Sequence, residues 1–108
     1  MVPENPALVD EIEAMLLEPP HGGDAAIARV EQTLTDGYAQ ALALEAERWR
    51  IERRIAQIAR RIADGDAADA AQELSSLSER LSAMDDELSR LRCSLTSLRR
   101  HADAVRAA

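Results

Sequence analysis

Side chains that could act as nucleophiles, general acids or bases, or metal ligands are few in this sequence and stand far apart. The two histidines, His21 and His101, are separated by eighty residues, and neither has a cysteine or aspartate at ligand spacing. The sequence contains no Ser/His/Asp set, P-loop or glycine-rich phosphate loop. We therefore expect no enzymatic activity, no cofactor, no bound metal and no small-molecule substrate.

The single cysteine, Cys93, cannot form a disulfide within the chain and is insufficient for a zinc site. It falls at an outward heptad position of a predicted helix, so its thiol is expected to be exposed. Two interpretations stay open for it. Cys93 is either an ordinary surface cysteine or the site of an intermolecular disulfide or another redox function.

Composition favours thin helix-on-helix contacts over a thick globular core. The 108 residues include no Phe, one Trp and one Tyr, and they carry a formal charge of −7. This charge disfavours nucleic acid and anionic membranes as partners, because both bind clusters of positive charge. The first residues have neither a basic segment nor a continuous apolar stretch, so we expect no signal peptide or transmembrane helix. A cytoplasmic protein is the resulting expectation.

Residues 1–23 are predicted to form a short helix followed by a Pro/Gly connector. Asn5 can cap the helix, and Pro6 fits its first position. Apolar residues then recur at helical spacing, at Leu8, Val9, Ile12, Met15 and Leu16. Pro19 and Pro20 end the helix, and Asp24 is placed to cap the next one.

Residues 24–108 carry two stripes in which apolar residues step by three and four, the pattern of packed helices. Gly37 and Arg48 interrupt the first stripe, and no polar residue interrupts the second. The first stripe is Ile27, Val30, Leu34, Ala41, Leu44, Ile51, Ile55, Ile58 and Ile62, and the second is Ala67, Ala70, Leu74, Leu77, Leu81, Met84, Leu88, Leu91, Leu95, Leu98, Ala102 and Val105. The predicted fold is all-α: a long antiparallel two-helix coiled-coil hairpin with its turn at 64–66 and a short N-terminal helix.

The two stripes can be aligned so that every a position meets a d position, with Ile55 opposite Leu77. Charge supports this alignment, because an arginine-rich segment of the first arm then faces an acidic segment of the second. Glu47 is left to face either Arg80 or Glu87. Arms of about forty residues would form a rod roughly 60 Å long, and Arg48 is expected to extend from the seam toward Glu45 or Asp85.

Tyr38, Leu42 and Trp49 occupy e and b positions of the first arm, which makes its apolar face wider than a two-helix seam requires. The N-terminal helix is expected to fold back onto this face as far as Tyr38, which leaves Trp49 uncovered. Three interpretations stay open: self-association, a different protein partner, or a Trp49 ring shielded by the stems of Arg53 and Glu45. The shortage of buried surface favours a homodimer with two-fold symmetry.

The predicted tip carries a G-D-x-x-D-x-A-Q string that begins at Gly65 and ends at Gln72. This string resembles the acidic hairpin tips of Gre-type transcript-cleavage factors and DksA-type regulators, which enter the secondary channel of bacterial RNA polymerase. The resemblance implies that Asp66 and Asp69 would act near the catalytic magnesium of the polymerase. The same two residues are also explained as an N-cap and a first-turn acid of the second arm.

Two functions are therefore considered. The first is a non-catalytic protein–protein interaction or scaffold module that binds itself or a helical partner through Tyr38, Leu42 and Trp49. The alternative is a bacterial RNA polymerase secondary-channel regulator that acts through Asp66 and Asp69.

Overall fold

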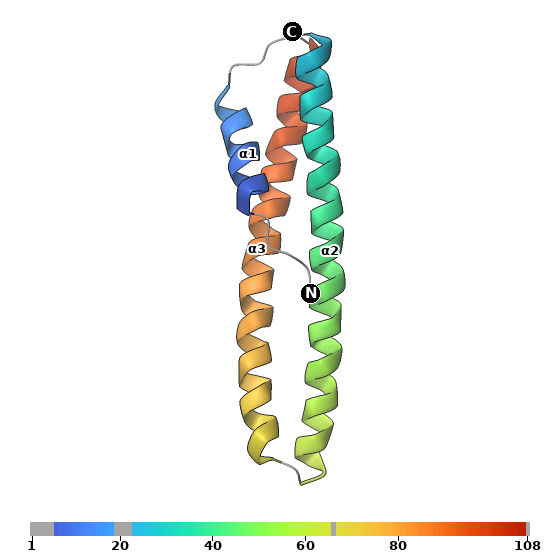
Figure 1. Cartoon of the computed structure of the whole chain (residues 1–108), viewed down its shortest axis with the longest axis vertical. Coiled ribbons are helices and arrows are strands. Elements are labelled where there is room, and N and C mark those ends of the chain that lie inside the picture. Colours follow the sequence, from blue (N-terminus) through green and yellow to red (C-terminus); the bar gives the residue numbers. More distant parts are fainter. Residues whose placement is uncertain (1–5, 19–22, 66, 108) are drawn as a thin grey trace.

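The computed structural model describes residues 6–18, 23–65 and 67–107. It contains three helices, α1 (Pro6–Leu17), α2 (Asp24–Ala63) and α3 (Ala68–Ala107). The 40-residue helices α2 and α3 lie side by side and run in opposite directions, and α1 lies beside the half of the hairpin farthest from its turn (Figure 1). The molecule measures 64 × 18 × 18 Å. The predicted antiparallel hairpin with a short N-terminal helix is confirmed.

The core is the narrow seam where the apolar stripes of α2 and α3 meet. Near the turn, Ile51, Ile58, Ala70 and Leu77 are buried together, and Ile55 packs against them. Toward the open end a second cluster contains residues of all three helices: Leu8, Ile12, Met15, Val30, Ala41, Leu44, Leu88, Leu91, Leu95, Leu98 and Ala102. Burial of these stripes supplies the main driving force for folding the hairpin.

Polar pairs on both sides of the seam define the register of the two helices. On one side, called the Tyr38 flank, the pairs are Arg106–Glu31, Arg99–Tyr38 and Arg92–Glu45. Successive pairs are one heptad apart on each helix, so a single register is kept along the open half. On the other side, called the Thr33 flank, Nη2 of Arg80 lies 3.6 Å from Oε1 of Glu47. Of the two partners considered for Glu47, this contact selects Arg80.

Arg48 lies at the boundary between the two apolar clusters. Its Nε is 2.6 Å from Oδ1 of Asp85, and its Nη2 is 3.4 Å from Oε1 of Glu52. The guanidinium therefore leaves the seam toward Asp85, one of its two expected partners, and reaches the Tyr38 flank. The interruption at Arg48 is tolerated because the charge is paired and 43% of the side chain stays exposed.

Gly37, the other interruption of the first stripe, provides space for Leu95. A Cβ atom at position 37 would clash with Cδ2 of Leu95 and would lie only 3.4 Å from its Cγ. Leu95 is almost completely buried. The glycine therefore lowers the helix propensity of α2. In return, its missing side chain leaves room for Leu95 of α3 to pack into the seam.

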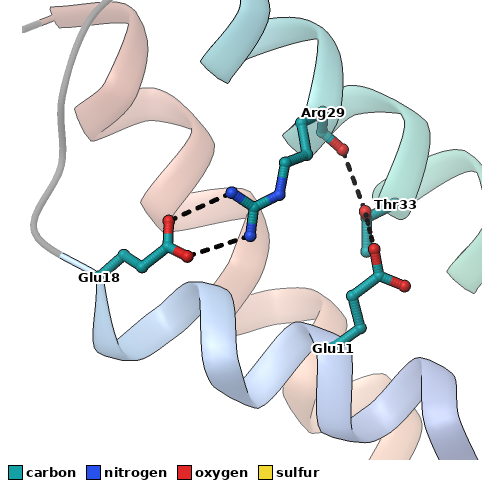
Figure 2. Close-up of polar contacts among 4 residues, drawn as sticks. All are labelled: Glu11, Glu18, Arg29 and Thr33. Carbon is teal, nitrogen blue, oxygen red and sulfur yellow. Dashed lines mark hydrogen bonds and ion pairs between the residues drawn. The ribbon is translucent and has the colours of Figure 1, made fainter.

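Helix α1 docks through one apolar face and two polar contacts. Leu8, Ile12 and Met15 are buried against the hairpin. Nη2 of Arg29 lies 3.0 Å from Oε1 of Glu18, and Nη1 donates to the other carboxylate oxygen at 3.4 Å (Figure 2). The hydroxyl of Thr33 lies 3.0 Å from the carbonyl oxygen of Arg29 and 3.4 Å from Oε1 of Glu11 (Figure 2). These contacts place α1 against the Thr33 flank.

The expectation that α1 covers the face of Tyr38 is therefore wrong. On the Thr33 flank the open half presents short side chains, including Ala26 and Ser94, and an apolar helix can approach them closely. On the Tyr38 flank the same segment carries the long pair Glu31–Arg106 in place of short side chains, so the apolar face of α1 finds no close contact there. Helix α1 consequently leaves the Tyr38 flank open.

The helix ends differ from prediction at one point. Gly23, and not Asp24, is the N-cap of α2, and it makes no side-chain capping bond. Asp24 is instead the first helical residue, where its charge complements the helix dipole. At the turn, α2 ends at Ala63 and Gly65 takes a positive φ of 100°. The predicted caps Asn5 and Asp66 lie outside the described residues.

We expect Gly37→Ala to destabilise the hairpin by about 1 kcal/mol, because the cost of moving a buried Leu95 exceeds the gain in helix propensity. In a Leu95→Ala background the obstructing atoms are gone, and Gly37→Ala should then stabilise the protein by about 1 kcal/mol. Urea unfolding monitored by circular dichroism measures all four proteins of this cycle. Equal effects of Gly37→Ala in both backgrounds would show that position 37 does not face Leu95.

Candidate interaction surface

Three large apolar side chains of α2 are exposed on the Tyr38 flank, as their heptad positions predict. Tyr38 is 42% exposed, Leu42 is 67% exposed and Trp49 is 58% exposed. Their spacing along α2 puts them on one side of the helix, and we call the surface that they form the association face. Because α1 docks on the opposite side of the seam, no described segment covers the association face.

A depression of about 450 Å³ lies over the seam between α2 and α3 at the open-end half of the association face. Tyr38 and Leu42 form its α2 side, and Arg92 and Thr96 form its α3 side. Its remaining lining residues are Ala41, Glu45 and Leu95. The small Ala41 and Thr96 leave this space between longer neighbours, so an apolar side chain of a partner could enter between the two helices.

The Trp49 ring lies farther toward the turn and is held by a neighbouring arginine. The guanidinium carbon of Arg53 is 4.7 Å from the ring centroid, a cation–π contact. Glu45, the other residue expected to shield Trp49, pairs with Arg92. Since more than half of the Trp49 surface remains exposed, its neighbours on α2 orient the indole without removing it from water.

The described acidic residues at the tip have functions within the hairpin itself. Asp69 is exposed in the first turn of α3, where a carboxylate stabilises the helix N-terminus. Asp66, the other candidate acid, lies outside the described residues. Glu73 is used within the hairpin, because its Oε1 accepts from Nη2 of Arg54 at 2.8 Å.

Other groups considered for chemistry are scattered in the structure. Cys93 is exposed, as its heptad position predicts. His101 is partly buried on α3, and His21 lies outside the described residues. Within residues 6–18, 23–65 and 67–107, no three His, Cys, Asp or Glu side chains converge as a metal site. No helix in this part of the chain combines the length and apolarity needed to cross a membrane.

Among the described residues, Glu47 is the one buried carboxylate, and it lies on the Thr33 flank at 8% exposure. Arg50 donates to its Oε2 from Nε at 3.0 Å and from Nη2 at 2.8 Å. These hydrogen bonds hold the pKa of Glu47 below its usual value, against the opposing effect of burial. Arg80 adds a weaker attraction across the seam. Glu47 therefore links both helices as a charged group.

Sequence reasoning named the α2 residues of the association face and missed the α3 residues beside them. Arg92, Thr96 and Arg99 lie at e and b positions of α3, which meet the e positions of α2 once the register is known. The predicted alignment of the stripes contained this information. The surface is thus formed by both helices of the hairpin.

Comparisons with known proteins found no match to this chain among family models, curated proteins or solved structures.

We expect Glu47→Gln to be less stable than the wild type at neutral pH, and this difference should shrink at acidic pH. The lowered pKa means that the ionised form contributes stability above the unfolded value of about 4.3 and loses it as pH falls through the folded value. Urea midpoints between pH 3 and 7 measure the effect. The exposed Glu79→Gln is the control, and a stability difference for Glu47→Gln that is constant across this range would contradict the assignment.

Proposed function

We propose that this protein is a non-catalytic protein–protein interaction or scaffold module that acts through the association face. Its partner is a second copy of the chain or a helical segment of another protein. The function requires a rigid rod that presents an apolar surface on one side, and it needs no reactive group.

The observation that carries this proposal is the position of the exposed apolar side chains. Among the described residues, the large hydrophobic side chains exposed to water are Leu17 and the three of the association face. Trp and Tyr are common anchors of protein interfaces because they bury much surface at a small entropic cost. Complete burial of Leu42 alone would contribute about 1.5 to 3 kcal/mol to binding.

The rest of the hairpin supports a structural function. A single register is maintained by paired side chains on both flanks, and the resulting rod is 64 Å long. Such a rod can hold its partners at a fixed separation. The depression between Tyr38 and Arg92 adds a site that a partner's apolar side chain could fill.

The alternative function, regulation of bacterial RNA polymerase through the secondary channel, depends on the acids of the tip. Only Asp69 can be evaluated in the structure, and its exposure in a first helical turn is what any capping acid would show. The association face has no part in that function. The two proposals therefore predict opposite responses to substitution at Asp69 and at Trp49.

To test the proposal, the tagged full chain is incubated with lysate of its native host, and bound proteins are identified and quantified. A specific partner, either the untagged chain or another protein, should be retained by the wild type. Trp49→Ala should lower its retention about tenfold or more, because an interface anchor typically contributes at least 2 kcal/mol.

Two variants serve as controls in the same experiment. Leu17→Ala removes an exposed apolar side chain on a different helix and should leave retention unchanged. Asp69→Ala should also have no effect. Recovery of RNA polymerase subunits that is lost with Asp69→Ala and kept with Trp49→Ala would contradict the interaction module and support the alternative.

A further inference from the structure

The charges along the Tyr38 flank are distributed unevenly, and this distribution selects one partner for the association face. At the level of Tyr38, the guanidinium of Arg99 donates to the phenol oxygen at 3.2 Å, and within the described residues it has no carboxylate partner. Nearer the turn, Glu52 and Asp85 share the single guanidinium of Arg48. The first level, called the positive level, therefore carries a guanidinium that has no carboxylate partner among the described residues. The second, called the negative level, carries two carboxylates that share one guanidinium, and the nearby Arg53 is engaged with the Trp49 ring.

These two levels are placed symmetrically about Glu45. Tyr38 and Glu52 are each seven residues from Glu45, which is about 10 Å along the helix in either direction. Glu45 itself pairs with Arg92, so the level midway between the positive and negative levels is neutral. A two-fold axis through this level would exchange the positive level with the negative one.

The apolar side chains have the same symmetry. Leu42 and Trp49 are seven residues apart on α2, and the midpoint between them falls next to Glu45. The same two-fold axis would bring Leu42 of one copy against Trp49 of the other, and the reverse. An isologous interface requires this kind of self-complementarity, in which one surface matches itself after rotation.

We propose that the occupant of the association face is a second copy of this chain, packed side by side with its long axis reversed. This inference rests on the proposed function, because it uses the same face and names its partner. In the complex, Leu42 contacts Trp49 of the second copy, and Arg99 pairs with the second copy's Glu52 and Asp85. The product is a bundle of four long helices with a helix α1 on each outer side.

The geometry of the rod fits this arrangement. Glu45 is close to the midpoint of the 40-residue helix α2, so two reversed rods overlap along nearly their whole length. A contact strip about 60 Å long and 10 Å wide on each copy would bury on the order of 1,200 Å² in total, the size of a small specific interface. Helix α1 lies on the Thr33 flank and does not obstruct this contact.

A parallel pairing of the rods is disfavoured by the same charges. In a parallel pair, the two-fold axis would run along the rod. Arg99 would then lie near Arg99 of the second copy, and Glu52 would lie at the same level as Glu52 of the second copy. Like charges in contact cost binding free energy and exclude that orientation when the reversed one is available. In the reversed orientation, the positive level of each copy faces the negative level of the other.

The test is a charge swap measured by sedimentation equilibrium across a range of concentrations. Arg99→Glu and Glu52→Arg should each weaken the wild-type dimer by about tenfold or more, because each creates two repulsive contacts in a two-fold complex. The double variant, Arg99→Glu with Glu52→Arg, should restore dimerisation. Circular dichroism of each variant checks that the helical hairpin remains folded.

The possible outcomes separate this inference from the proposed function. Dimers that are insensitive to both single changes, or a double variant weaker than either, would overturn the reversed arrangement and leave self-association in place. A monomeric wild type at 100 µM would overturn the second copy as occupant, while the lysate experiment still decides whether the face binds another protein. Dimers unaffected by Trp49→Ala would contradict both proposals.

Discussion

Burial of two continuous apolar stripes against each other is the constraint on which the rest of this structure depends. Few large side chains are available, so the stripes of α2 and α3 must remain in contact along 40-residue helices to bury enough surface. A single register buries the stripes along the whole hairpin, from Val30 near its open end to Ala70 near its turn. The flanking residues are then fixed in position, and the two flanks become chemically different surfaces.

This difference between the flanks determines what is covered and what is left open. Short side chains near Thr33 admit α1, which adds three buried residues to the open-end cluster. Long paired side chains on the Tyr38 flank keep that side free of α1. Tyr38 therefore remains exposed as a consequence of how α1 docks, and Trp49 lies farther toward the turn than the short helix α1 would reach.

The heptad stripes allowed the hairpin, its turn and its register to be predicted, because a period of three and four residues specifies the buried side of each helix. The alignment of Ile55 with Leu77 agrees with their common cluster, and Leu42 and Trp49 are exposed as expected, whereas Tyr38 was expected to be covered by α1. The docking side of α1 was not predictable from periodicity, since it depends on the relative bulk of the two flanks. Likewise, the depression near Tyr38 depends on how side chains from both helices pack.

Each chain folds back on itself, and we propose that two such hairpins lie side by side. Small-angle X-ray scattering of the full chain, coupled to size-exclusion chromatography, tests both parts in one measurement. A side-by-side pair of hairpins should give the scattering mass of two chains with a maximum dimension close to the 64 Å of a single rod. The mass of one chain would contradict the pairing, and the mass of two chains at about twice that length would contradict the side-by-side hairpins.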